Sequence, residues 1–154
     1  MARISGVAIK HQPEHHMLTI RKTIDFMKEY SNFMDQTLEA ITRYMDTVGI
    51  VPSGGPIVCF HNMDLEYLDV EAGWAVATAV AGNDEITANT VCAQKVATAI
   101  DQGPYEEQDS TLMDIFAWIE ENGYEPQGPI YYHYLNDTDR SPEKFLTQMV
   151  LPVK

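Results

Sequence analysis

Two similar segments follow one another along the chain, and this repeat restricts the possible folds more than any other feature of the sequence. The first segment, from Thr37, reads TLEAITRYMDTVGIVPSGGPIVCFHN, and the second, from Thr111, reads TLMDIFAWIEENGYEPQGPIYYHYLN. Their alignment pairs Gly49 with Gly123 and, after one residue is dropped, GPI with GPI. Such a repeat is too long for a solenoid unit. We therefore expect a duplicated supersecondary module, with copies at about residues 4–82 and 86–154, in one pseudo-symmetric domain over residues 1–154.

The middle of each copy has the apolar spacing of a helix, with apolar residues three or four positions apart. In the first copy these are Tyr30, Met34, Leu38, Ile41, Met45 and Val48, and in the second they are Leu112, Ile115, Phe116 and Ile119. Asp109 or Ser110 is expected to cap the start of the second helix. Gly49 and Gly123 stand where each helix is expected to end in a left-handed residue.

Strands are expected on both sides of each helix. Apolar runs from Met17 and from Val91 come before the two helices. A turn at residues 52–56 is expected to lead into a pair of strands at 56–62 and 67–80, and the second copy repeats this pair at 129–135 and 144–153. Each module therefore has the order β-α-β-β. The fold class that follows is α+β, with one antiparallel sheet and two helices on one of its faces.

The charge of the chain excludes several classes of partner. Asp and Glu number 23 against 10 Lys and Arg, which gives a formal net charge of −13. A nucleic-acid partner or an anionic membrane surface would need a basic face, so neither is expected. No apolar run approaches the ~20 residues of a membrane span, and the N-terminus does not resemble a signal peptide. Cys59 and Cys92 form no paired framework, which is typical of a reducing cytoplasm.

Short motifs give the chain a family resemblance. They are GPYEE at 103–107, WIEENGY at 118–124, GP-x-x-x-x-YL-x-D at 128–137 and a terminal LPV at 151–153. In this order they resemble the GyrI-like family of small-molecule-binding domains, which also occur as effector-binding domains of AraC-type and MerR-type multidrug-sensing regulators. The resemblance covers nearly the whole chain. It implies a duplicated β-α-β-β fold with a ligand cleft along the pseudo-twofold axis, in a free-standing member that binds bulky, often aromatic or cationic compounds.

The acidic residues of that family are not all present in this chain. Family members often have a Glu two residues before the Tyr of the YL-x-D segment, where this chain has Tyr132. A second common Glu falls on Gln148. The first copy has Glu71 at the position that the repeat aligns with Gln148, so Glu71 is our candidate for the missing acidic group.

The candidate ligand-binding residues lie mainly on the predicted strands. Tyr132 and Tyr134 share a strand face because side chains alternate, and the repeat aligns them with Cys59 and His61. A buried carboxylate, Glu71 or Glu66, would favour a cation, and aromatic faces would add to this. The full predicted set is Cys59, His61, Tyr67, Glu71, Trp74, Tyr105, Trp118, Tyr132 and Tyr134. Core packing is the alternative role for each aromatic residue, as it is for Phe116 and for Met27, Met34 and Met45.

No known cofactor or metal motif is present. The chain has no HExxH, clustered Cys/His set, P-loop, GxSxG or GxGxxG, so neither a cofactor nor a metal site is predicted. Cys59 and His61 could form a nucleophile–base pair, but strand neighbours at this spacing are not usually in contact. No catalytic residue is assigned on these grounds.

We weigh three functions. The first is a cytoplasmic protein that binds or sequesters aromatic or cationic amphiphilic compounds. The second, brought in by the resemblance, is a hydrolase of cyclopropane-bearing alkylating compounds, in which Glu71, Tyr132 and Tyr134 would perform acid–base chemistry. The third is an acidic protein that modulates DNA gyrase by imitating DNA. The charge equally serves solubility.

Overall fold

The computed structural model describes residues 2–136 and 139–154, so Asp137 of the third motif lies outside the described residues. Contacts between Cα atoms divide the chain into two compact units. The central unit is Glu14–Cys92, and the terminal unit combines the residues up to Pro13 with Ala93–Lys154. Each unit contains one of the two predicted helices, and each has the strand–helix–strand–strand order that the repeat predicts.

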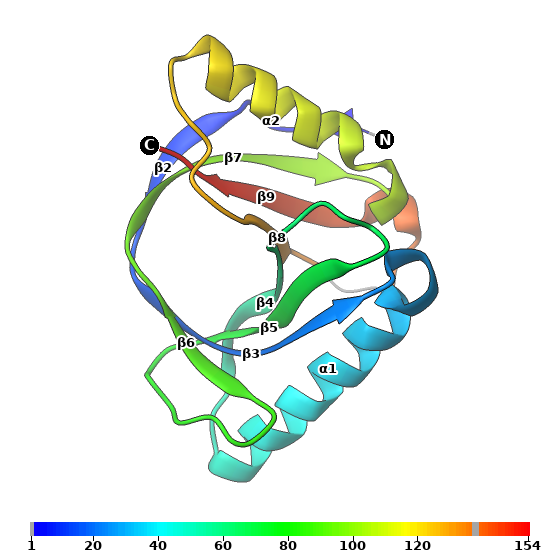
Figure 1. Cartoon of the computed structure of the whole chain (residues 1–154), viewed down its shortest axis with the longest axis vertical. Helices are drawn as coiled ribbons and strands as arrows, with labels where there is room; N and C mark the ends of the chain where they lie inside the picture. Colours follow the sequence, from blue (N-terminus) through cyan, green and yellow to red (C-terminus); the bar gives the residue numbers. More distant parts are fainter. Residues whose placement is uncertain (1, 137–138) are drawn as a thin grey trace. The chain divides into compact units, whose positions relative to one another are not determined.

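The central unit is an antiparallel sheet covered by a helix on one face. It contains β3 (His15–Ile24), α1 (Phe26–Val48), β4 (Pro52–Phe60), β5 (Leu68–Val76) and β6 (Thr87–Val91). The strand order is β4-β5-β3-β6, and α1 runs along one face of this sheet (Figure 1). The apolar core between helix and sheet includes Leu18, Ile20, Ile41, Met45, Val76 and Ile86. The opposite face of this sheet is not covered by α1, and we call it the uncovered face.

The ends of α1 follow from local sequence. Asp25 caps its start: its side chain accepts a hydrogen bond from the Lys28 amide, and its own amide donates to the Glu29 carboxylate. This reciprocal arrangement resembles a capping box, with the acidic partner at the fourth rather than the third helical position. The helix ends at Gly49, whose φ of 76° is the predicted left-handed conformation.

The buried face of α1 differs from the predicted stripe. It consists of Phe33, Thr37, Ile41 and Met45, in steps of four residues, whereas Val48 is 42% exposed. Steps of four place side chains almost directly above one another on a helix, so this row faces the sheet. The predicted residues Met34 and Leu38 flank this row and are half-buried.

The terminal unit repeats this arrangement with different edges. It contains β7 (Gln94–Gln102), α2 (Asp109–Glu121), β8 (Ile130–Tyr134) and β9 (Leu146–Pro152), and the order is β8-β9-β7. Two N-terminal strands, β1 (Ala2–Arg3) and β2 (Ala8–Gln12), pair with the other edge of β7. The short helices η1 (Tyr105–Glu107) and η2 (Pro142–Lys144) precede α2 and β9. Residues of α2, β7 and β9 form its core, including Leu112, Ile115, Ile119, Ala97, Met149 and Leu151.

Two local predictions were wrong, and three strands were missed. Gln108, not Asp109 or Ser110, occupies the position before α2, and it makes no side-chain cap. Residues 52–56 are not a turn but the irregular start of β4, where the register shifts between Pro52 and Pro56. The strands β1, β2 and β6 were not anticipated, because they are short and have no marked apolar alternation.

The predicted class of fold is confirmed. Each unit is an α+β module with an antiparallel sheet and a helix on one sheet face. Gly123 has a φ of 76°, as predicted for the end of the second helix. Within the described residues, neither helix is long and apolar enough to cross a membrane.

Candidate functional site

A carboxylate on the uncovered face of the central sheet is the centre of the candidate site. Glu71 belongs to β5, where Val70, Ala72 and Val76 are buried on the α1 side. Because strand side chains alternate, Glu71 points to the opposite face. Its neighbours there are Cys59, directly opposite on β4, and Thr19 on β3.

Three side chains form hydrogen bonds to this carboxylate. Thr19 Oγ1 donates to Glu71 Oε2 at 2.6 Å, and Asn89 Nδ2 also donates to Glu71 Oε2. Asn89 Nδ2 lies 3.2 Å from Thr19 Oγ1, so the two donors contact each other as well. His61 Nε2 is 2.8 Å from the other oxygen, Glu71 Oε1. A carboxylate oxygen accepts, so His61 Nε2 carries the proton in this pair.

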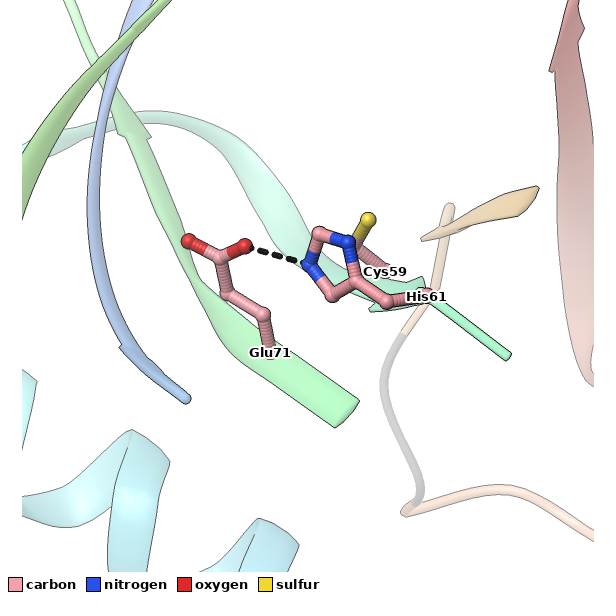
Figure 2. A group of neighbouring side chains, drawn as sticks. All are labelled: Cys59, His61 and Glu71. Carbon is pink, nitrogen blue, oxygen red and sulfur yellow. Dashed lines mark hydrogen bonds and ion pairs between the residues drawn. The ribbon is translucent and has the colours of Figure 1, made fainter. Parts of the chain in front are cut away.

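This hydrogen-bonded group is largely, but not completely, shielded from solvent. The side chains of His61 and Glu71 are 20% and 12% exposed, while Thr19 and Cys59 are buried. Figure 2 shows Glu71 and His61 joined by their hydrogen bond, with the Cys59 thiol beside the imidazole ring. The ligand atoms of Cys59, His61 and Glu71 all lie within 4.8 Å of one another. These three side chains could hold a metal ion.

An ion pair flanks the site. Arg21 lies opposite Glu71 across the β3–β5 pair, and its guanidinium donates two hydrogen bonds to the Asp69 carboxylate, at 2.8 and 2.7 Å. These hydrogen bonds hold the pKa of Asp69 below its usual range and raise that of Arg21. Arg21 is therefore engaged by Asp69 rather than by Glu71.

The structure brings together three of the predicted residues, Cys59, His61 and Glu71. The two predicted aromatic residues of the same unit, Trp74 and Tyr67, do not belong to this cluster. Trp74 is on the α1 side of β5, against the core of the central unit. Its indole Nε1 is buried and has no hydrogen-bond acceptor among the described residues. Tyr67, in the loop before β5, is 67% exposed.

Tyr132 and Tyr134 do share a face, as predicted, but not the face that corresponds to Cys59 and His61. Tyr132 lies opposite Met149 and packs against the core beneath α2. In the central unit, the equivalent face is the one covered by α1. The structural equivalence of the two strands therefore differs by one residue from the alignment of GPI with GPI. A shift of one residue moves a side chain to the opposite face of a sheet. Contact of either tyrosine with a ligand stays a prediction.

Tyr105 and Trp118 also belong to the terminal unit. The Tyr105 ring lies 5.0 Å from that of Tyr134 and 4.9 Å from that of Phe145, and burial raises the pKa of its hydroxyl. Trp118 stacks on Tyr124 at 6.0 Å and packs against the α2 core. Both form aromatic packing contacts, and contact of either residue with a ligand stays a prediction.

The sequence analysis missed Thr19 and Asn89. Thr19 lies within the apolar run that predicted β3. Its sequence signal as a site residue was that it is a single polar residue between apolar ones. Asn89 lies on β6, an unpredicted strand, so no pattern connected it with Glu71.

Comparison with known proteins settles the family. A family model described as the GyrI-like small molecule binding domain matches residues 6–154. The chain belongs to the GyrI-like family. No sequence among curated proteins matches it significantly. The resemblance inferred from the four motifs is thereby confirmed, and this GyrI-like chain is a small-molecule-binding domain.

Several solved structures share the GyrI-like fold of this chain. The C-terminal domain of EcmrR is similar with a TM-score of 0.87 and 19% identity, over 98% of both chains. In the EcmrR–DNA complex the TM-score is 0.85 at 19% identity, over 97% of this chain, which spans 57% of that EcmrR chain. A hydrolase from Listeria innocua has a TM-score of 0.70 at 19% identity, over 96% of this chain and 91% of that one.

A further similar structure carries a ligand. SAV2435 bound to tetraphenylphosphonium has a TM-score of 0.62 and 14% identity, over 97% of this chain and 94% of that one. Identities this low establish the common fold. The ligand of SAV2435 is a bulky aromatic cation.

Proposed function

We propose that this chain binds bulky aromatic or cationic amphiphilic compounds, as a multidrug-binding or sequestering protein, with Glu71 as the group that attracts the positive charge. The observation that carries the proposal is the shielded Glu71 carboxylate on the uncovered sheet face, held by hydrogen bonds from Thr19, Asn89 and His61.

The surroundings of Glu71 favour a cation for an electrostatic reason. Thr19 and Asn89 contribute a hydroxyl and an amide, which are neutral donors and orient the carboxylate without cancelling its charge. The neighbouring guanidinium of Arg21 is bound to Asp69. In a partly shielded position, a fixed charge interacts more strongly with an incoming cation than it would in open water. Glu71 is thus available to a cationic ligand.

The size and shape of the ligand are inferred from the family. A GyrI-like domain binds small molecules, and the similar structure of SAV2435 holds tetraphenylphosphonium. Such an ion has a delocalised charge and a weakly hydrated surface, so it loses little hydration on entering an apolar site. Aromatic side chains would attract it further through their ring faces.

The test uses tetraphenylphosphonium and its charge-reversed counterpart, tetraphenylborate, which has nearly the same shape. Isothermal titration calorimetry should show saturable binding of the cation and none, or far weaker binding, of the anion. Glu71→Gln should weaken cation binding by about tenfold or more, which corresponds to about 1.4 kcal/mol.

Glu66 is exposed in the loop between β4 and β5, so it is not the buried carboxylate that the sequence analysis offered as an alternative. Glu66→Gln is therefore the matched control, because it removes the same charge from an exposed position. It should leave the Kd unchanged. Equal affinities for the two ions, or an unchanged Kd in Glu71→Gln, would contradict the role assigned to Glu71.

A second candidate function is hydrolysis, which the His61–Glu71 hydrogen bond of 2.8 Å favours. An imidazole and a carboxylate in contact can move a proton to or from a water molecule. For a strained cyclopropane, that water would add its hydroxyl to one ring carbon and its proton to the departing carbon, so the product gains one water. Mass spectrometry of a cyclopropane-bearing alkylating compound would detect this gain. Unchanged substrate in the presence of a saturating amount of protein would reject hydrolysis.

A further inference from the structure

We propose that Cys59, His61 and Glu71 form a binding site for a thiophilic divalent metal ion such as Zn²⁺. This goes beyond the binding of organic cations, although both use the Glu71 carboxylate. The three side chains come from two adjacent antiparallel strands and from the residue that follows the first of them. They therefore have a rigid backbone framework.

The donor set matches the preferences of zinc. A thiolate, an imidazole nitrogen and a carboxylate oxygen are its three usual protein ligands, at about 2.3, 2.0–2.1 and 2.0–2.2 Å. Ligand atoms bound to one ion at these lengths are separated by about 3–4 Å. The corresponding atoms here already lie within 4.8 Å of one another. Side-chain rotations that move these atoms by about 1 Å would therefore bring all three within bonding distance of one ion.

The carboxylate is held in a suitable orientation before any ion arrives. Thr19 and Asn89 both donate to Glu71 Oε2, so Oε1 is the oxygen directed at His61. Ligating carboxylates in metal sites usually have such hydrogen bonds on their second oxygen. An ion placed between Glu71 and His61 would replace the proton that now joins them, and Cys59 would lose its thiol proton.

The burial of the group suits three protein ligands and one open position. Cys59 is only 4% exposed, which protects a thiolate–metal bond from water. His61 and Glu71 retain partial exposure, which provides a route of entry. A zinc ion with three protein ligands keeps a fourth position for water or a small ligand.

The test uses Co²⁺ as a coloured substitute for Zn²⁺, added to the tag-free chain under a phosphine reductant. We expect one Co²⁺ per chain, a thiolate-to-cobalt charge-transfer band in the near ultraviolet, and loss of the band when Zn²⁺ is added. Cys59→Ser should abolish the band. Cys92→Ser is the matched control, because Cys92 is an exposed thiol outside the cluster, and it should retain the band in full.

A further variant tests the orienting hydrogen bonds. Thr19→Val keeps the shape of the side chain and removes a donor to Glu71, so it should weaken metal binding by about 10–100-fold while the charge-transfer band at saturation persists. Circular dichroism would confirm that each variant folds. If Cys59→Ser does not fold, Glu71→Gln replaces it as the variant that loses a ligand.

The outcomes separate this proposal from the preceding one. Tetraphenylphosphonium binding is measured separately on the metal-free wild-type chain, so the two proposals are tested by different readouts. No charge-transfer band in the wild type, or a band that survives Cys59→Ser and disappears in Cys92→Ser, would overturn the metal site and leave the organic-cation site standing. Metal binding with no affinity for tetraphenylphosphonium would support the metal site and overturn the organic-cation site.

Discussion

The two units place a threonine at the same point of their first strand, but with different consequences. Thr19 lies opposite Gly73, and its hydroxyl donates to Glu71. Thr98 lies opposite Val150, and its hydroxyl is buried with no hydrogen-bond partner among the described residues. A buried hydroxyl without a partner costs about 1–3 kcal/mol. The threonine hydroxyl at this position therefore stabilises the central unit through a hydrogen bond and destabilises the terminal unit.

The residues around the two threonines explain the difference. The position of Glu71, opposite Arg21 on the first strand, corresponds in the terminal unit to Gln148, opposite Ile100. Both positions point away from the helix of their own unit, because their neighbours along the strand form the two cores. The duplicated framework is thus shared, whereas the carboxylate site belongs to the central unit. The comparison teaches that the site depends on a few side chains rather than on the module.

The largest effect is expected at Gly73. A Cβ added there would lie 1.9 Å from the backbone oxygen of Leu18, so β3 and β5 would have to move apart. Gly73→Ala should lower the free energy of unfolding by about 3 kcal/mol, the upper part of the usual range for overpacking. Urea denaturation measures this. Gly54→Ala is the control, since a Cβ there meets nothing within 4 Å, and it should change stability by less than about 0.5 kcal/mol. Equal effects of the two variants would contradict the close approach of β3 and β5 at Gly73.

The pair of threonines gives the next largest effect. Thr19→Val removes a buried hydrogen bond to a carboxylate and should cost about 2 kcal/mol. Thr98→Val removes a hydroxyl that has no partner among the described residues, so it should stabilise the fold by about 1 kcal/mol, the lower end of that cost. The two variants make the same chemical change, so chemical denaturation of both isolates the effect of Glu71. A loss of stability in Thr98→Val equal to that in Thr19→Val would contradict the comparison.

The sequence predicted the order of elements well, because that order depends on local signals. Apolar spacing located both helices, and Gly49 and Gly123 marked their ends because a left-handed residue favours glycine. Glu71 was also a predicted candidate, because the repeat aligns it with Gln148, where the family resemblance implies an acidic residue.

The geometry of the site was less predictable, for two physical reasons. The face of a strand depends on its position to within one residue, and an alignment through short GPI segments could not fix that position for Tyr132 and Tyr134. The partners Thr19 and Asn89 lie far from Glu71 in sequence and reach it only through strand pairing. A single sequence contains no periodic signal for such pairing.

A smaller effect is expected from giving the terminal unit the missing carboxylate. In a Gln148→Glu background, the Thr98 hydroxyl would have an acceptor placed as Glu71 is for Thr19. Thr98→Val should then cost about 1 kcal/mol, although it stabilises the wild type, and a double-mutant cycle measures this coupling. A coupling of zero would mean that Val150 keeps the two side chains apart. In that case the glycine at position 73, rather than the acid alone, distinguishes the two units.

The smallest effect concerns the ion pair beside the site, which the terminal unit also lacks. Arg21 and Asp69 face each other diagonally across β3 and β5, and the corresponding residues across β7 and β9 are Ile100 and Leu146. The pKa of Asp69 is lowered by its hydrogen bonds to Arg21, so the folded chain holds the Asp69 proton less tightly than the unfolded chain. The pair therefore stabilises the fold above the ordinary Asp pKa of about 4, and this stabilisation is lost as the pH falls through the lower pKa of the folded state.

Asp69→Asn measures the contribution of this pair. Both partners are partly exposed, so water and salt screen the interaction, and the variant should lose about 0.5 kcal/mol at pH 7. The difference from the wild type should shrink toward zero as the pH falls through the folded-state pKa of Asp69, because the wild-type carboxylate is then protonated as well. It should also decrease at high salt. Urea denaturation at a series of pH values checks both trends, and a difference independent of pH would show that Asp69 acts through its shape rather than its charge.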